Sequence, residues 1–190
     1  MTATAFNKST PAKPPRQISW EEFKRRYLHR EDHFKYEWVN GIVEKMPRSI
    51  DRTQIYIQNN LLDFFYQLKA TKGMTGNLIA EGDTLFGGNH RRPDMAYYTQ
   101  VQIEAGRRDE DVSPAFVIEI ISTQDQMGKV HAKMKDYRAA NVQVVWHIFP
   151  KLEEIHVYHG KNMTICLSND FCSAEPVIAG FVLSVKDVLK

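Results

Sequence analysis

The chain has 190 residues, of which 43% are apolar and 25% are charged, and these values are typical of one globular domain with a substantial core. The net charge of +2 is too small for the field of the whole molecule to attract nucleic acid, so such a surface would need local clustering. The two cysteines, Cys166 and Cys172, fit neither a zinc site nor a disulfide framework, which indicates a reducing, cytoplasmic compartment. No stretch approaches the roughly 18 consecutive apolar residues of a membrane span, so no membrane association is expected.

The first part of the chain predicts a leader, a short helix and a hairpin. Residues 1–17 are small, polar and proline-bearing, which is typical of a flexible leader, and residues 18–190 are expected to form a single domain. Ser19 and Glu22 match a capping box that opens a helix reaching about His29. Alternating residues on both sides of an Asn-Gly pair then predict a β-hairpin over residues 34–46.

The spacing of apolar residues predicts the remaining elements. Helical spacing indicates helices over residues 51–69 and 129–140, and Ser184 is placed to cap a last helical turn. The polar residues 104–112 indicate a loop with one helical turn. Strand-like runs lie at residues 78–86, 94–98, 115–121, 142–149, 155–158 and 163–167. We therefore predict an α/β (α+β) fold, a mixed β-sheet flanked by helices with an N-terminal and a C-terminal β-hairpin.

Two acidic residues stand out within the predicted core strands. Glu119 lies in the middle of residues 116–122, an otherwise apolar and β-branched run typical of a strand buried on both faces. An ionised carboxylate is costly there unless it is paired with a cation or binds a metal. Asp94 follows Pro93 directly at the start of the preceding strand. Two acids on neighbouring core strands indicate a site rather than a scaffold.

A lysine on the next helix is placed to join them. Val130, Met134 and Tyr137 form one apolar stripe that should face the sheet. Lys133 lies beside this stripe, whereas Lys135 points toward solvent. A lysine beside an apolar stripe often only extends past it to solvent. With the two acids, however, it makes a coherent site for metal-dependent hydrolysis of a phosphodiester.

These residues resemble a known nuclease pattern. Pro93-Asp94, Glu119-Ile120-Ile121 and Lys133 resemble the motif of the PD-(D/E)XK nuclease superfamily, which has a restriction-endonuclease-like fold. More narrowly, the chain from about Ser19 to about Tyr158 resembles the Uma-two family, bacterial restriction endonucleases catalogued as a domain of unknown function. The blocks that carry this narrower resemblance are residues 36–41, 93–94 and 117–122, then Asp125, Lys133, Tyr137 and residues 145–150.

The resemblance implies an Mg²⁺-dependent or Mn²⁺-dependent endonuclease that hydrolyses phosphodiester bonds in DNA. It implies that Asp94 and Glu119 are metal ligands, with the Ile120 carbonyl as a possible third. Lys133 would assist the attacking water, and Glu37 would be an additional acid near the site. Nucleases of this fold are often dimers that match the two-fold symmetry of a duplex, so a homodimer is expected.

The chain departs from the family pattern at three places. Ile121 replaces the superfamily's lysine, and the lysine on the next helix takes over. Thr123 stands where the family has proline, and Arg52 or Thr53 stands where a histidine is common. The last two differences, with the modest net charge, favour an alternative function: a catalytically inactive nuclease-fold module that binds or interacts.

Two sets of charged residues have simpler interpretations. Glu37 shares a face of its strand with Lys35, and solvated hairpin charge is the default for such a pair. Arg91 and Arg92 come directly before Pro93-Asp94 and could hold phosphates of a DNA duplex. An ordinary solvated loop explains these two arginines equally well, and the sequence leaves both possibilities open.

Overall fold

The computed structural model describes residues 15–47, 52–123 and 125–190. A six-stranded sheet forms its centre, with strands in the order β10-β9-β8-β7-β6-β3. β7 and β8 pair in parallel, and the other neighbouring strands pair antiparallel. This mixed sheet confirms the predicted fold class. Its strands are β3 (Asn77–Ala80), β6 (Met95–Tyr98), β7 (Phe116–Ile120), β8 (Val144–Phe149), β9 (Glu154–His159) and β10 (Asn162–Leu167).

A second sheet has four strands in the order β2-β1-β5-β4. The predicted N-terminal hairpin is confirmed: Asn40 and Gly41 turn the chain with φ of 50° and 82°, the left-handed region that this pair favours. β1 is an interior strand, because it pairs with β5 on the side away from β2. The strands of this sheet are β1 (Phe34–Val39), β2 (Ile42–Pro47), β4 (Thr84–Phe86) and β5 (Asn89–Arg91).

The helices follow the predicted capping signals. Ser19 accepts the Glu22 N–H at 3.1 Å, and Ser184 accepts the Asp187 N–H at 3.1 Å, so both predicted caps are confirmed. No helix in the described parts of the chain is long and apolar enough to cross a membrane. The helical elements are α1 (Trp20–Phe23), the π-helical η1 (Lys24–Leu28), α2 (Arg52–Lys72), α3 (Gln100–Gly106), α4 (Met127–Ala139) and α5 (Val185–Leu189).

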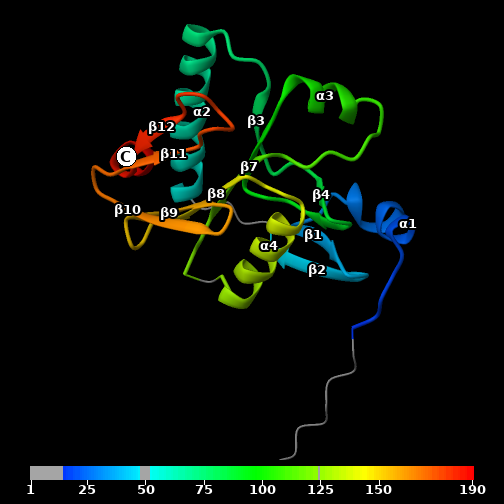
Figure 1. Cartoon of the computed structure of the whole chain (residues 1–190). Helices are drawn as coiled ribbons and strands as arrows, with labels where there is room; N and C mark the ends of the chain where they lie inside the picture. Colours follow the sequence, from blue (N-terminus) through cyan, green and yellow to red (C-terminus); the bar gives the residue numbers. More distant parts are fainter. Residues whose placement is uncertain (1–14, 48–51, 124) are drawn as a thin grey trace, which may run out of the picture.

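The helices divide between the two faces of the six-stranded sheet. α2, α5 and a small third sheet of β11 (Phe171–Ser173) and β12 (Val182–Ser184) pack with one face into the larger apolar core. α4 and β4 pack with the other face through Met134, Tyr137 and Phe86. Figure 1 shows α1 and the β1–β2 hairpin at one end of the molecule, and α2 with β9 to β12 at the other.

The structure corrects the prediction of one strand over residues 78–86. Glu81 adopts φ of 50°, and the chain leaves the six-stranded sheet after β3 to enter the four-stranded sheet as β4. β5 and the β11–β12 pair were not predicted, because each strand has only three residues. The helical turn expected within residues 104–112 lies earlier, since a capping box of Thr99 and Gln102 opens α3.

The expected leader and the start of the expected helix at Asp51 lie partly among residues that the structure does not describe. Residues 1–14 of the expected leader and Asp51 of the expected helix lie outside the described residues. Within the predicted leader, Gln17 forms a β-bridge with Ile42. Attachment to the domain therefore begins before residue 18.

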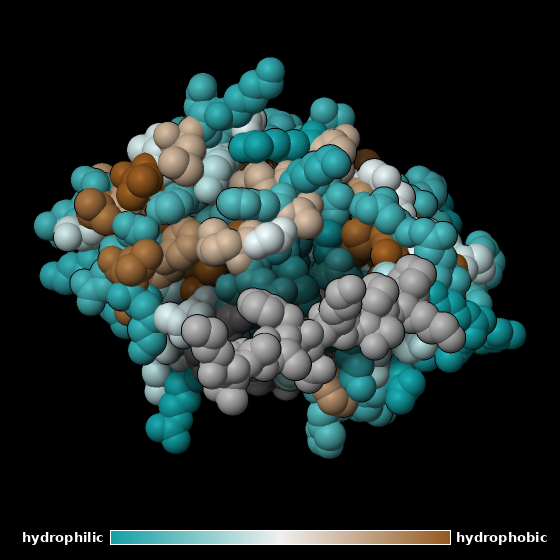
Figure 2. Space-filling model, turned by 90° about the horizontal axis from the view of Figure 1, so that it is seen from below, coloured by the Kyte–Doolittle hydropathy of each residue, from teal (hydrophilic) through white to brown (hydrophobic). Residues whose placement is uncertain are grey.

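Exposed apolar side chains gather near one edge of the large sheet. Met163, Ile165 and Leu167 alternate along β10, the edge strand, and each is about half exposed. In Figure 2, most apolar residues of the face seen from below lie on the left, where Figure 1 places β9 and β10, and a smaller apolar patch lies to the right of the centre. The rest of that face is mainly hydrophilic, and it is hollowed near its centre.

Candidate active site

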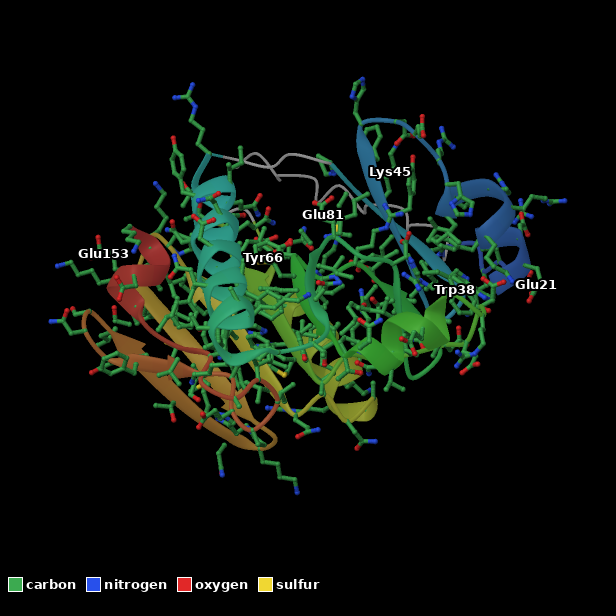
Figure 3. All side chains as sticks on the ribbon, turned by 90° about the horizontal axis from the view of Figure 1, so that it is seen from above. Glu21, Trp38, Lys45, Tyr66, Glu81 and Glu153 are labelled. Atoms are coloured by element: carbon green, nitrogen blue, oxygen red, sulfur yellow. The ribbon has the colours of Figure 1, made fainter. Side chains whose placement is uncertain are left out.

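A cleft of about 490 Å³ brings the two predicted acids together. Asp94 and Glu119 line it, and the end of β7 with the following residues 120–123 forms one part of its wall. Two other lining residues are labelled in Figure 3: Lys45 lies on the β1–β2 hairpin, and Glu81 lies between this hairpin and α2. The cleft also receives four lysines from β1, β2 and α4: Lys35, Lys45, Lys129 and Lys133.

Glu119 is held by two side chains of α4. Lys133 Nζ donates to Glu119 Oε2 at 2.7 Å, and the Tyr137 hydroxyl donates to Glu119 Oε1. The two donors are four residues apart and therefore lie on one side of the helix. Lys133 leans over the sheet toward the acid, as the helix phase predicts. Tyr137, which the sequence placed on the apolar stripe and in the family pattern, is a second partner of Glu119.

Lys133 carries a stable positive charge. Burial alone would lower its pKa, but the charges of Glu119, Glu37 and Asp94 outweigh burial and raise it. The side chain is only 14% exposed, and its ammonium lies 3.8 Å from Glu37 Oε1. Lys133 is thus a protonated counter-ion for several acids, which does not suit it to act as a proton acceptor.

Asp94 is the least neutralised acid of the cluster. Its Oδ2 accepts the backbone N–H of Ile120 at 2.7 Å, and its Oδ1 lies 3.8 Å from Lys35 Nζ. Burial, followed by the negative charge of Glu119, raises the pKa of Asp94 to about 6, although Lys35 and Lys133 act in the opposite direction. A cation bound between the two acids would relieve this repulsion.

Glu37 lies beneath the cleft rather than in solvent. It is fully buried, accepts from Arg91 Nη1 at 2.9 Å and accepts the Arg92 N–H at 3.0 Å. Burial would raise its pKa, but the charges of Lys133, Lys35 and Arg91 lower it to about 2. The interpretation of Lys35 and Glu37 as solvated hairpin charge is therefore wrong, because β1 is an interior strand covered on both faces.

Arg91 and Arg92 do not line the cleft as a phosphate-binding surface. The Arg91 side chain is 1% exposed, and its Nε donates to Asp136 Oδ2 at 2.8 Å while Nη1 donates to Glu37. Arg92 donates to both carboxylate oxygens of Asp83 and to the Leu28 carbonyl. Each guanidinium is occupied within the protein, so neither of the two expected roles, phosphate binding or a solvated loop, matches these positions.

The donor set of the cleft fits a hard divalent cation. Asp94, Glu119 and Ile120 all line one cavity, and Mg²⁺ is bound in proteins by one or two carboxylates together with waters and substrate phosphates. The described residues contain no group of three or more His, Cys, Asp or Glu side chains arranged to hold a metal ion. The fit is therefore to an open Mg²⁺ or Mn²⁺ site and not to a closed structural site.

Comparisons with known proteins identify the family and agree with the fold. The Uma2 family model, described as "Putative restriction endonuclease", matches residues 20–186. The chain belongs to the Uma2 family. The match covers the site elements from β1 to α4, and it is the family that the sequence motifs resemble.

A solved structure shows the same fold for this Uma2 chain. The crystal structure of a protein from Anabaena variabilis, described as a "putative nuclease belonging to DUF820", superposes with a TM-score of 0.75. The superposition covers 90% of this chain and 97% of the other at 19% sequence identity. No curated protein matches the chain. The Uma2 chain therefore has a nuclease-like fold.

Two residues around the site were not expected from sequence. Lys35 lines the cleft, and the signal that could have revealed it is the Lys-x-Glu pattern between aromatic residues of a strand buried on both faces. His147 lies beside Glu119 in register on β8. Burial lowers the pKa of His147 to about 4, and its Nε2 has no hydrogen-bond partner among the described residues. A neutral imidazole thus packs next to the glutamate.

Proposed function

We propose that the chain is an Mg²⁺-dependent or Mn²⁺-dependent endonuclease that hydrolyses phosphodiester bonds in DNA. The observation that supports this proposal most is the meeting of Asp94 and Glu119 with four lysines in one cleft. Hard oxygen ligands suit the metal, and lysines suit the phosphates of a nucleic acid. The family and the fold support a nuclease, and the proposal adds the metal and the substrate.

Each residue of the cluster has a distinct part in this proposal. Asp94, Glu119 and the Ile120 carbonyl would hold the metal, which when bound activates a water and neutralises charge on the phosphate. Lys133 holds Glu119 in place and supplies positive charge near the attacking water. Glu37 fixes Lys133 from below, at 3.8 Å, so we assign the additional acid a positioning role.

Lysines on the walls of the cleft would contact the DNA backbone. Lys45 on β2 and Lys129 on α4 are both exposed and both line the cleft. They take the place of Arg91 and Arg92, which are tied to carboxylates of the protein. Phosphate contacts of this kind give affinity that depends on salt and little sequence preference.

One observation favours the alternative of a catalytically inactive binding module. Glu119 already accepts hydrogen bonds from Lys133 and Tyr137, so a metal must compete with Lys133 for this carboxylate. Titration calorimetry with Mg²⁺ and Mn²⁺ separates the two functions. Uptake that is lost in Asp94→Ala and Glu119→Ala supports the nuclease, and no uptake by the wild type supports the module.

Plasmid cleavage tests the proposed activity directly. Supercoiled DNA is incubated with Mg²⁺ or Mn²⁺ and with the wild type, Asp94→Ala, Glu119→Ala or Lys133→Ala. We expect cleavage by the wild type and a loss of at least about a thousandfold in the two acid variants, because the metal site is removed. Glu153→Gln, which changes an exposed acid in the β8–β9 turn, is the matched control and should cut like the wild type. Equal cleavage by all the proteins would place the activity in a contaminant or at another site.

The homodimer and the cytoplasmic location remain predictions. Met163, Ile165 and Leu167 on the β10 edge offer an exposed apolar strand where two copies could pair. Light scattering coupled to size exclusion measures the mass in solution, and a value of one chain would overturn the dimer.

A further inference from the structure

Lys35 is a largely buried cation whose ammonium makes no hydrogen bond within the part of the chain that the structure describes. The residue is 9% exposed, and it enters the cleft from β1. Among the described residues its Nζ makes one ion pair, with Asp94 Oδ1 at 3.8 Å, a distance too long for a hydrogen bond. An ammonium has three donors. Lys35 Nζ is not one of the fully buried side-chain atoms that lack a partner, so the ammonium faces the open cleft, where a ligand can reach its donors.

The other buried lysine of the cleft is in the opposite situation. Lys133 Nζ lies 2.7 Å from Glu119 Oε2 and 3.8 Å from Glu37 Oε1. It is committed to the acids of the protein. The two lysines enter from different elements, Lys35 from β1 and Lys133 from α4, and both line the same cavity as Asp94.

We propose that Lys35 is a catalytic residue that binds a non-bridging oxygen of the phosphate group in the cleft, while Lys133 serves to hold Glu119. This inference rests on the proposed function and adds to it the residue that meets the phosphate to be cleaved. The two lysines thereby divide the roles that the sequence assigned to Lys133 alone.

The chemistry of the site selects a phosphate as the ligand of Lys35. A small molecule with one carboxylate would bring a single charge next to Asp94 and Glu119. A phosphate instead offers several acceptor oxygens, which can contact an ammonium and a bound cation together. Lysine binds phosphate as a point charge and does not need the bidentate geometry of arginine. Lys35→Arg should therefore retain the contact in large part, and Lys35→Met, which keeps only the apolar stem, should lose it.

Binding of inorganic phosphate tests the contact without metal or catalysis. Calorimetry in EDTA compares the wild type with Lys35→Met and Lys35→Arg, and with Lys161→Met as a matched control in the exposed β9–β10 turn. We expect at least about a tenfold loss of affinity in Lys35→Met, as for a charge-assisted hydrogen bond. Lys35→Arg should stay within a few-fold of the wild type, and Lys161→Met should be unchanged. Equal affinity in Lys35→Met, or no phosphate binding by the wild type, would overturn the inference.

A second measurement uses the wild-type fold. The ¹⁵N ammonium resonance of Lys35, assigned by its absence in Lys35→Arg, should shift on addition of phosphate, and an unchanged resonance would contradict the contact. Single-turnover DNA cleavage then separates the two proposals. Phosphate binding through Lys35 without cleavage by the wild type overturns the proposed function alone. Cleavage by Lys35→Met at the wild-type rate, with unchanged phosphate affinity, overturns the role of Lys35 alone.

Discussion

The two faces of β7 show two ways of burying a strand. Phe116, Ile118 and Ile120 point into the apolar core beneath α2. On the opposite face, Val117 continues an apolar cluster, but Glu119 meets Lys133 and Tyr137 of α4. The first, the apolar face, is stabilised by packing. The second, the ionic face, depends on the balance of buried charges around Glu119.

The ionic face is not fully neutralised by the protein. Among the described residues, the three cations Lys35, Lys133 and Arg91 face five buried or partly buried acids: Glu37, Glu44, Asp94, Glu119 and Asp136. Asp94 carries the deficit, as its raised pKa shows. The apolar face thus serves stability, whereas the ionic face holds charge that a bound ligand can balance.

The largest loss of stability is expected on the apolar face. Phe116 is fully buried, with ring centroids 5.3 Å from Trp146 and 5.9 Å from Phe181. Phe116→Ala should lower the free energy of unfolding by about 3–5 kcal/mol. Urea denaturation measures this loss, and Mg²⁺ affinity of the folded variant should not change. A loss below about 1 kcal/mol would show that the two faces do not differ in this way.

On the ionic face, removal of the Lys133 charge should lower the free energy of unfolding almost as much. Lys133→Met leaves Glu119 without its ion pair, and we expect a loss of about 3 kcal/mol, the lower end for a buried pair since the side chain is 14% exposed. The double variant with Glu119→Gln should recover part of this loss, because the uncompensated charge is gone. Additive losses in a denaturation cycle would contradict the coupling between these two residues.

Neutralising Asp94 should raise the free energy of unfolding, in contrast to the two losses above. Its pKa is about 6 in the folded protein against 3.8 for an ordinary aspartate. The native state therefore holds the proton more tightly, and stability falls as the pH rises from about 4 through about 6. Asp94→Asn should be more stable than the wild type at pH 8 by at most about 3 kcal/mol, and equal to it below about pH 4. Melting curves across this pH range check the sign, and a variant less stable at pH 8 would refute it.

The smallest effect is expected at the rim of the cleft. Lys45→Ala and Lys129→Ala should each reduce the slope of log affinity against log salt for a DNA duplex by about 1, since each removes about one phosphate contact. Stability should be unchanged, because both residues are exposed. Fluorescence anisotropy at several salt concentrations measures the slope, with Lys161→Ala as control. An unchanged slope would place the DNA elsewhere.

The sequence predicted the parts of the fold that depend on local patterns. The Asn40-Gly41 hairpin, the caps at Ser19 and Ser184 and the phase of α4 follow from short-range chemistry. Asp94, Glu119 and Lys133 meet because each lies at a position whose direction the element fixes. These geometric predictions needed no knowledge of the tertiary structure beyond the order of neighbouring strands.

The rest depended on contacts distant in sequence. Glu37 and Arg91 are 54 positions apart, and only the pairing of β1 with β5 brings their side chains together. Without knowledge of that pairing, the sequence predicts that β1 is an edge strand with one solvated face and that Arg91 belongs to a loop. The chain also passes from one sheet to the other at Glu81, which has a left-handed backbone conformation. The sequence did not reveal this change, because the residue is not a glycine.

Because β1 is an interior strand, the residues of the site come from two separate segments of the chain. Residues 15–47 supply Lys35 and Glu37, whereas Asp94, Glu119 and Lys133 come from the segment after residue 51. A chain divided between residues 47 and 52 would yield two fragments, and neither would hold the complete set of charges. The hairpin is thus a natural half for split-protein complementation, in which the cleft forms only when both pieces associate.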